Sequence, residues 1–496
     1  MDKRIQRLGI VMLLCFVALF VQLNNIQVIK ANSLASSPAN PNVIAVQRSQ
    51  PRGDILSADG VNLATSVPTT SGYYKYQRVY NKNTAVLFSQ IVGYDTIFGT
   101  RTGIEAEYNS YLQSHTRPAK NLRDLLVNRT TTDNVTLTID SHLQSQVAAA
   151  VDATDVNGGA PQAGAVVINV KSGAIEAMYS NPTFDPTGLA SQSSTTVLQT
   201  YNALQPRTGQ SPLVSRAFQY PFSPGSTFKV VTSSAVYDHQ PALAKIDYPV
   251  KGCIPLPQSN QLLCNYGHGA EQCGGTLSQT LAASCNTAFA QMGMALGATS
   301  LNNEAQSFGF NQPVPLDLPV VGVSNFPAVA QLANNAPSQA YSAFGQQNVS
   351  ATALQMALVA AGIADRGVIM TPHLMAQIRD SQGNLVQSYA PKPWLTATSS
   401  VTAAAVTTLM QGVVTHGTAT GVGFPSAWNV AAKTGTAQTG TSNQLTNDWM
   451  IAFAPANDPK VAVAVVIPNQ PSDQTGASTS GPPMKTILGD ALAQTP

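Results

Sequence analysis

The sequence carries few charges. Asp, Glu, Lys and Arg make up 10% of the 496 residues, against a usual share of about a quarter. The formal net charge is +2 and no basic stripe runs along the chain, so no nucleic acid or strongly acidic partner is implied. Cysteine pairs at zinc-binding spacing and a glycine-rich phosphate loop are also missing. Apolar residues still make up 44% of the chain, and its length predicts at least two domains.

A long uncharged run lies close to the N-terminus. Lys3, Arg4 and Arg7 precede a stretch from Leu8 to Ile29 that has no charge. At about 1.5 Å rise per residue, this stretch can cross a hydrocarbon core of roughly 30 Å. The preceding cations predict a cytoplasmic N-terminus and a single-pass protein of the cell membrane, with the remainder outside the cytoplasm. The alternative is a signal peptide cleaved near residues 33–35. That position lies far beyond the apolar run, which favours an uncleaved anchor.

Most of the cysteines fall in one region. Cys15 lies in the apolar run, whereas Cys253, Cys264, Cys273 and Cys285 cluster in a segment expected in an oxidising compartment. Four cysteines allow three pairings, and the sequence alone does not choose among them. Pairing of neighbours, 253 with 264 and 273 with 285, closes the shortest loops. Free buried thiols are the alternative.

Composition divides the chain into segments. We expect a cytoplasmic tail and anchor at 1–30, a Ser, Asn and Pro-rich linker at 31–50, a small mostly-β domain at 51–158 and a larger domain at 159–496. In the larger domain, hairpin strands at 163–180 precede helical patterns at 226–236, 276–297 and 350–364, and strand patterns return at 427–438, 448–454 and 461–467. Residues 186–215 are polar and indicate a long loop. This order predicts an α+β fold whose sheet joins the first and last segments.

A serine and a lysine three residues apart open one of the predicted helices. Ser226 follows Pro224 and Gly225, at a helix start where free N–H groups favour an alkoxide or oxyanion. Lys229 lies on the same face, and it can act as a base if burial or a second cation lowers its pKa. A capping serine beside an exposed lysine is the alternative. Lys229 is the only lysine in the chain with a serine three residues before it.

Two further elements follow in order. Ser284 and Asn286 lie in a segment with an amphipathic helical pattern, where a hydroxyl and an amide can transfer a proton and orient a substrate. Lys433, Thr434, Gly435 and Thr436 lie in a strand-like stretch, where a lysine and two hydroxyls suit a carboxylate ligand. Similar triplets at 171–173 and 300–302 are explained by a hairpin turn and a helix cap.

The ordered set Ser-x-x-Lys, Ser-x-Asn, Lys-Thr-Gly resembles that of penicillin-binding proteins and serine β-lactamases. The whole chain is similar to class B penicillin-binding proteins, and most similar to the actinobacterial PbpA type. The segments that carry this resemblance are PRGDILSADGVNLATS (51–66), GTRTGIEAEYNSYL (99–112), LTIDSHLQ (137–144) and GAVVINVKSGAIEAMYSNPTFDP (164–186). It implies a pedestal domain resembling the penicillin-binding protein dimerisation domain, followed by a β-lactamase-like transpeptidase domain with a central antiparallel sheet flanked by helices.

The resemblance also implies a chemistry. Ser226 would attack the D-Ala-D-Ala end of a peptidoglycan stem peptide, with Lys229 as base. Ser284 would pass the proton to the departing amine, and Asn286 would hold the substrate amide. The backbone N–H groups of residues 226 and 436 would form the oxyanion hole. Residues 433, 434 and 436 would bind the terminal carboxylate. β-Lactams would acylate the same serine, and no metal or organic cofactor is implied.

The missing glycosyltransferase domain points to class B, and the resemblance therefore implies a partner polymerase of the SEDS family. Two alternatives remain open. One is a hydrolase, either a D,D-carboxypeptidase or a β-lactam-hydrolysing relative, and the other is a non-catalytic cell-wall scaffold or β-lactam sensor. The anchor and pedestal argue against a secreted β-lactamase. The intact set of motifs argues against an inactive scaffold, and the few residues before the span argue against a sensor.

Overall fold

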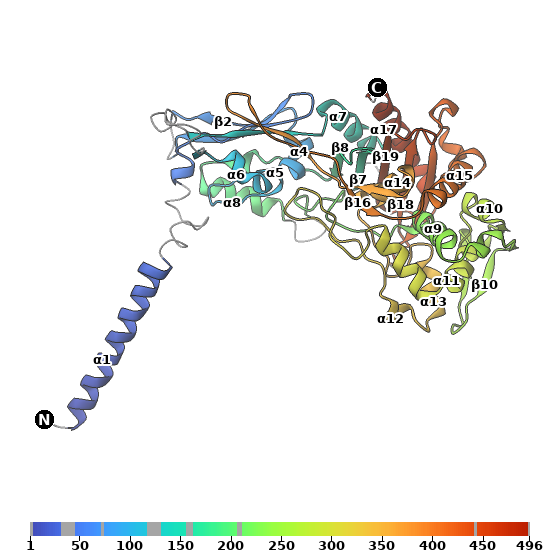
Figure 1. Cartoon of the computed structure of the whole chain (residues 1–496), viewed down its shortest axis with the longest axis horizontal. Coiled ribbons are helices and arrows are strands. Elements are labelled where there is room, and N and C mark those ends of the chain that lie inside the picture. Colours follow the sequence, from blue (N-terminus) through green and yellow to red (C-terminus); the bar gives the residue numbers. More distant parts are fainter. Residues whose placement is uncertain are drawn as a thin grey trace.

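An N-terminal helix and a two-part body make up the molecule (Figure 1). The computed structural model describes residues 3–30, 45–70, 74–116, 130–154, 162–205, 211–440 and 444–494. The predicted linker, 31–50, lies for the most part outside these ranges. The helix α1 (Lys3–Asn24) continues into a π-helical turn, η1 (Asn25–Ile29).

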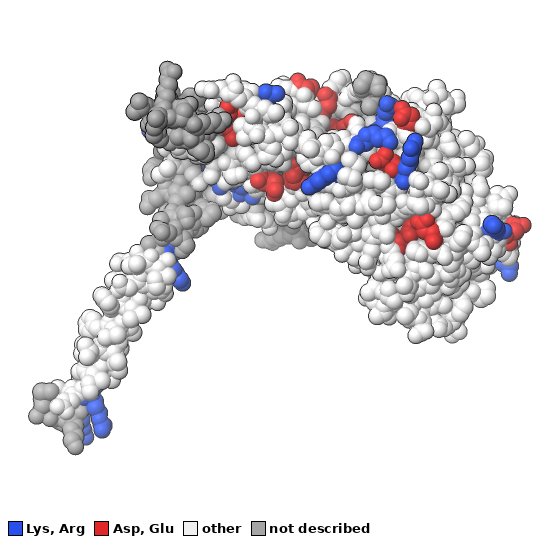
Figure 2. Space-filling model, in the orientation of Figure 1, with Lys and Arg blue, Asp and Glu red and all other residues white. Residues whose placement is uncertain are grey.

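The N-terminal helix is long and apolar enough to cross a membrane. The apolar span runs from Arg4 to Ile29 with a mean hydropathy of 2.1, and its side chains are not buried by the rest of the protein. Figure 2 shows it almost free of charge between its two ends. Exposed Leu, Phe and Val side chains of this kind need an apolar environment. This supports the predicted membrane anchor.

The pedestal is built around a twisted sheet of six strands in the order β15-β14-β6-β1-β2-β3. Its bounds are β1 (Ile55–Leu56), β2 (Asn62–Pro68), β3 (Tyr76–Tyr80), β6 (Asp133–Leu137), β14 (Met375–Asp380) and β15 (Leu385–Ser388), with β4 (His115–Thr116) paired to β5 (Thr130–Thr131) beside it. The helices α4 (Ala85–Val92), α5 (Gly103–Glu107) and α6 (Asn109–Leu112) accompany it. β1 and β6 are parallel, and the other pairs are antiparallel.

Two of these strands come from far along the chain. β14 pairs with β6, Ile378 opposite Val135, and β15 continues the sheet. The pedestal segment predicted at 51–158 therefore does not contain all the strands of its own sheet. Conversely, α7 (Ser141–Asp152) lies in that segment but packs against β8 (Ile175–Asn181) and α17 (Gly481–Gln494) of the larger domain.

The larger domain contains a five-stranded antiparallel sheet, β17-β18-β19-β7-β8. The strands are β7 (Ala163–Asn169), β8 (Ile175–Asn181), β17 (Ala431–Gln438), β18 (Thr446–Ala454) and β19 (Val461–Gln470). β19 pairs with β7, so the first and last segments of the domain share one sheet, and the predicted α+β fold is confirmed. β18 and β19 are almost wholly buried, as expected for strands with helices on both faces.

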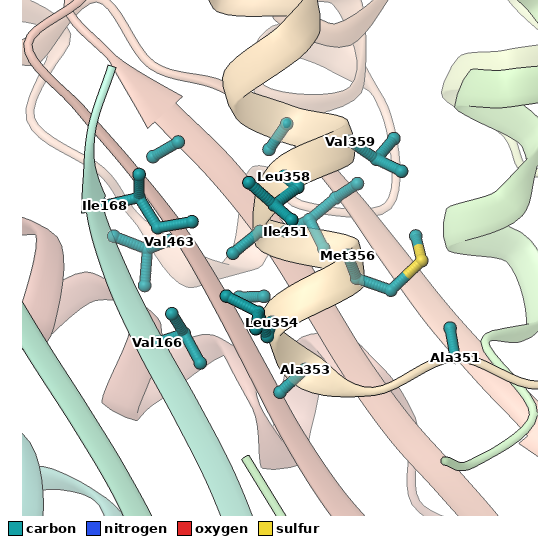
Figure 3. Packing of buried hydrophobic residues seen from close by; sticks show 14 of the residues in the cluster. Val166, Ile168, Ala351, Ala353, Leu354, Met356, Leu358, Val359, Ile451 and Val463 are labelled. Atoms are coloured by element: carbon teal, nitrogen blue, oxygen red, sulfur yellow. The ribbon is translucent and has the colours of Figure 1, made fainter. Parts of the chain in front are cut away.

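Helix α14 (Ala353–Ala364) lies across this sheet and is buried on every side. Figure 3 shows Leu354 and Leu358 directed at Val166, Val463 and Ile451 of the strands beneath. Helix α17 (Gly481–Gln494) also packs on β19 and β18. A sheet packed in this way is stiff, because interiors at crystal-like density resist displacement of their side chains.

The remaining elements complete the larger domain. They are η3 (Thr187–Ala190), α8 (Ser194–Ala203), η4 (Gly225–Phe228), α9 (Lys229–His239), η5 (Pro241–Lys245), β9 (Tyr248–Lys251), β10 (Cys253–Pro255), β11 (Leu262–Cys264), η6 (Gly267–Gly269), β12 (Cys273–Gly275), α10 (Leu277–Ala282), α11 (Asn286–Ser307), α12 (Val329–Leu332), α13 (Ala336–Ser342), β13 (Val368–Met370), β16 (Pro393–Thr396), α15 (Ser400–His416), η7 (Thr420–Val422), η8 (Ser426–Trp428) and α16 (Gly476–Thr479).

Two local predictions are wrong. Residues 186–215 contain helix α8, whose first turn is capped by Ser193 accepting from the N–H of Thr196. Ser and Thr are poor helix formers but good caps, so the composition of this segment predicted a loop in place of the helix. The helix expected at 276–297 is broken between α10 and α11, at the residues that carry the Ser-x-Asn motif.

Asp317 joins the pedestal to the larger domain. Its carboxylate accepts from the hydroxyl of Tyr108 in the pedestal at 2.6 Å and from the N–H groups of Leu374 and Met375 at 2.6 and 2.8 Å. Leu374, just before β14, and Met375, its first residue, are buried, so their N–H groups have little access to water as an alternative acceptor.

Replacing Asp317 by Ala should therefore destabilise the protein. Loss of acceptors for two buried N–H groups costs about 2–4 kcal/mol of unfolding free energy. Chemical denaturation of the full chain measures the effect. Asp473→Ala, which alters an exposed carboxylate, is the control. Equal stability of the two variants would contradict this role.

Candidate active site

Ser226 lies in the 3₁₀ turn η4, which continues into α9 at Lys229. Its position is set by Gly225, whose φ of +52° is accessible to glycine and whose N–H donates to the carbonyl of Gly345 at 2.9 Å. Phe228 anchors the turn by stacking on Phe326, with ring centroids 5.2 Å apart. Ser226 is partly exposed, as a nucleophile has to be, while the turn behind it is buried.

Lys229 is wholly buried, with 0% of its surface exposed. Its Nζ donates to the carbonyl oxygen of Ser284 at 2.6 Å, to Oδ1 of Asn286 at 2.8 Å and to Oγ of Ser284 at 3.3 Å. The rings of Phe289 and Phe344 lie 5.3 and 5.7 Å from it. Among the residues that the structure describes, no carboxylate forms a salt bridge with this ammonium group, so it is held by neutral acceptors and ring faces.

Lys433 reaches the same place from β17. Its Nζ donates to Oγ of Ser284 at 2.9 Å and to the carbonyl of Thr434 at 2.9 Å. Burial lowers the pKa of Lys433 to about 7. Burial, together with the charge of Lys433, lowers the pKa of Lys229 well below its ordinary value. The hydroxyl of Ser284 thus lies between two amines that both deprotonate more readily than an ordinary lysine.

Ser284 has an unusual backbone. Its φ is +59°, a region that usually favours glycine. The N–H of Cys285 bonds to the carbonyl of Thr280 and that of Ser284 to the carbonyl of Leu281, the two bonds of a Schellman helix end. The motif therefore begins where α10 stops, and Asn286 begins α11. This is why the predicted continuous helix is wrong here.

Disulfides surround the Ser-x-Asn segment. Cys273 is bonded to Cys285, the residue between Ser284 and Asn286, and Cys253 is bonded to Cys264. Neighbouring cysteines are thus paired in the structure. The amide of Asn286 also donates weakly to the carbonyl of Cys264, at 3.4 Å.

The strand β17 passes close to the Ser226 turn. A Cβ at Gly435 would lie 2.8 Å from the carbonyl oxygen of Pro224, so only glycine permits this approach. The hydroxyl of Thr434 lies 2.6 Å from that of Thr418, and Oγ1 of Thr436 accepts the N–H of Gly476 at 3.0 Å.

The structure therefore brings together Ser226, Lys229, Ser284, Asn286 and the stretch 433–436, from four separate elements. The similar triplets at 171–173 and 300–302 make other contacts. Lys171 is exposed and pairs with Asp365 at 2.6 Å. Asn302, in the second half of α11, donates to the carbonyl of Pro327.

Three participants were not predicted. Thr418 and the rings of Phe289 and Phe344 gave no signal in the sequence, because their contacts with the site are long-range. Cys285, by contrast, is among the cysteines predicted as possible disulfide partners, and it is bonded to Cys273.

Comparisons with known proteins agree with this geometry. The penicillin binding protein transpeptidase domain matches residues 163–489, and the penicillin binding protein A dimerisation domain matches residues 52–135. Peptidoglycan D,D-transpeptidase PbpA of Mycolicibacterium smegmatis is 32% identical over 505 residues, covering 100% of both chains. PbpA of Mycobacterium tuberculosis is 32% identical over 511 residues, again covering 100% of both.

Solved structures share the fold. The ceftriaxone acyl-enzyme complex of penicillin-binding protein A from M. tuberculosis superposes with a TM-score of 0.79 at 29% identity, covering 90% of this chain and 100% of that one. The D,D-transpeptidase domain of a peptidoglycan glycosyltransferase from Eggerthella lenta has a TM-score of 0.75 at 31% identity, covering 90% and 99%. With its three motifs gathered at one site, the chain belongs to the class B penicillin-binding proteins, in the PbpA type.

Proposed function

We propose that the protein is a membrane-anchored peptidoglycan D,D-transpeptidase that works through an acyl-enzyme on Ser226. The observation that carries this proposal is the buried Lys229, which has neutral acceptors in place of a carboxylate and lies one helical turn beyond a partly exposed serine. Burial and the charge of Lys433 lower the pKa of Lys229, which favours the neutral amine that a base for a serine requires.

In the acylation step, Oγ of Ser226 attacks the carbonyl carbon of the penultimate D-alanine and Lys229 accepts its proton. The backbone N–H groups of Ser226 and Thr436 stabilise the oxyanion. As the intermediate collapses, the peptide C–N bond breaks. A proton relayed through Ser284 from the amine of Lys229 or Lys433 then reaches the departing D-alanine. Asn286 orients Lys229 and the substrate amide.

The terminal carboxylate of the donor peptide binds at the stretch 433–436. Lys433 supplies the charge, and the hydroxyls of Thr434 and Thr436 supply hydrogen bonds. In the second step, the amine of another stem peptide attacks the acyl-enzyme and releases Ser226, which completes the cross-link. A β-lactam acylates Ser226 in the same way. When its ring opens, however, the leaving nitrogen remains joined to the acyl group through the rest of the molecule and does not diffuse away.

The proposal includes a topology. The N-terminus faces the cytoplasm, residues 31–50 link the anchor to the pedestal at 51–158, and residues 159–496 carry the active site, with β14 and β15 reaching back into the pedestal. A polymerase of the SEDS family supplies the glycan strands, which this chain does not make itself.

Substitutions at Ser226 and Lys229 test the function. Ser226→Ala should abolish labelling by a fluorescent penicillin, and Lys229→Met should slow it by about 10²–10⁴-fold, the usual contribution of general-base catalysis. Met is chosen because it fills the buried site without a charge. Lys171→Met, at the exposed lysine of the similar triplet, is the matched control and should label normally. Normal labelling of Lys229→Met would overturn its assignment as base.

The same protein separates transpeptidation from the alternatives. A transpeptidase should form cross-linked dimers from stem peptides and hold a penicilloyl group for much longer than seconds. Loss of the penicilloyl group within seconds would indicate a β-lactam hydrolase, and release of D-alanine without dimers would indicate a carboxypeptidase. Full rescue of a deletion strain by Ser226→Ala would indicate a scaffold.

The two lysines predict a pH dependence. Lys229 acts as base when neutral, so acylation rises with pH through its lowered pKa. Lys433 binds a carboxylate when protonated, so the second-order acylation rate should fall by about tenfold per pH unit above its pKa of about 7. Lys433→Arg should move this descending limb beyond pH 9, because arginine stays protonated. A wild-type rate that still rises from pH 7 to 9 would contradict the role of Lys433.

The disulfide at Cys285 predicts a link between redox state and activity. Joining residues 273 and 285 closes a short loop worth about 3 kcal/mol in the chain-entropy description, and it restrains the residue between Ser284 and Asn286. The double variant Cys273→Ser, Cys285→Ala should lower the melting temperature and slow penicillin acylation by about tenfold. The control Cys253→Ser, Cys264→Ser should be destabilised with a smaller loss of rate. Equal rates in both variants would contradict a positioning role.

A further inference from the structure

The pedestal contains a buried ionic cluster that the proposed reaction does not use. We call it the arginine cluster. Its members are Arg48, Arg52, Arg78, Arg101, Asp95 and Glu105. Glu105 bridges Arg52 and Arg78 at 2.6 and 2.5 Å, and Asp95 bridges Arg48 and Arg101 at 3.1 and 2.9 Å. The exposed fractions of the four arginine side chains are 10%, 9%, 1% and 12% in chain order.

The charges of the arginine cluster do not balance. Four guanidinium groups face two carboxylates, which leaves two positive charges, and no further carboxylate joins them within the described parts of the chain. Burial and the guanidinium groups of Arg52 and Arg48 lower the pKa of Arg101, against the opposing pull of Asp95. Excess positive charge away from water is costly, so such a site favours an anion that neutralises it.

The cluster also has unused donors. Nη2 of Arg78 and Nε of Arg48 are buried and have no hydrogen-bond partner. Both residues line a hollow of about 30 Å³, which has room for about two water-sized atoms. Ser66 and Tyr76 line it as well, and the exposed residues Gln50 and Pro51 lie at its edge, so it can be reached from solvent.

We propose that the arginine cluster is a binding site for a phosphate group, either free phosphate or the headgroup phosphate of an anionic lipid. A phosphate carries between one and two negative charges near neutral pH, matching the excess of two positive charges. Two of its oxygens can enter the hollow and accept the N–H groups that the guanidinium groups present, while the rest of the phosphate lies at the open edge beside Gln50 and Pro51. Bound phosphate would join residues 48–52, where the linker from the anchor meets the pedestal, to β3 and to residue 101.

Thermal unfolding of the full-length protein in a neutral detergent tests this site. Inorganic phosphate should raise the melting temperature saturably, beyond sodium chloride at the same ionic strength. Arg48→Gln and Arg101→Gln should each weaken the apparent phosphate affinity by at least about tenfold, the effect of losing one charge-assisted contact. Lys82→Gln, at an exposed pedestal lysine, is the matched control and should keep the affinity.

A gain-of-function variant covers the case in which the arginine variants do not fold. Ser66→Asp places a carboxylate beside the cluster in the position of the anion. It should melt at a higher temperature than the uncharged, similarly sized Ser66→Asn, and its melting should no longer depend on phosphate. Phosphate stabilising the wild type no more than chloride would overturn the proposal, as would Ser66→Asp melting at or below Ser66→Asn.

Nanodiscs distinguish the two sources of phosphate. If the phosphate response seen in detergent disappears in phosphatidylglycerol nanodiscs but persists in phosphatidylcholine nanodiscs, the lipid headgroup occupies the site. If it persists in both, the ligand is free phosphate. In either case penicillin labelling of Arg48→Gln should match the wild type, so failure of this site and failure of the proposed transpeptidase activity are separate results.

Discussion

The burial of the Lys229 ammonium group without a counter-charge is the constraint on which the active site depends. A salt bridge to a carboxylate would relieve the desolvation of Lys229, but it would also raise the pKa of the amine and remove the base. The structure instead provides a carbonyl, an amide and a hydroxyl as acceptors, with two aromatic faces nearby. These contacts hold the amine in place and leave its protonation responsive to Lys433 and to a bound substrate.

Each neighbour of Lys229 is in turn fixed by an element that cannot easily move. The turn carrying Ser226 is wedged between Gly345 on one side and Gly435 on the other, and both contacts require the absence of a Cβ. Behind it, α14 is buried along its whole length against the sheet (Figure 3). Ser284 is kept at a positive φ by the Schellman bonds and by the disulfide at the next residue. The cost of these strained and desolvated groups is spread over a large core, which is how active sites retain them.

The sequence was most informative where the chemistry is local. Ser226 and Lys229 are three residues apart, which is the spacing of neighbours on one face of a helix. Apolar runs such as VAVAVV in β19 indicate buried strands, whichever strands they pair with. It was least informative where tertiary contacts override local preference. The alanine-rich segment around Ser284 favours helix, but α10 ends at the αL conformation of Ser284, next to the residue that is cross-linked to Cys273. The polar sequence of α8 predicts a loop, because the helix depends on the Ser193 cap and on the packing of Val197.

The pedestal shows the same limit at the level of domains. No local signal reveals that β14 and β15, which follow the buried helix α14 in the chain, complete a sheet begun more than three hundred residues earlier. This arrangement has a mechanical consequence. The segment that covers the catalytic sheet continues directly into the pedestal sheet, and Asp317 bonds to both parts where that segment enters β14. A displacement of the pedestal is therefore transmitted through a packed strand, whereas a flexible linker would absorb it. We therefore expect the pedestal and the catalytic domain to unfold together as one cooperative unit.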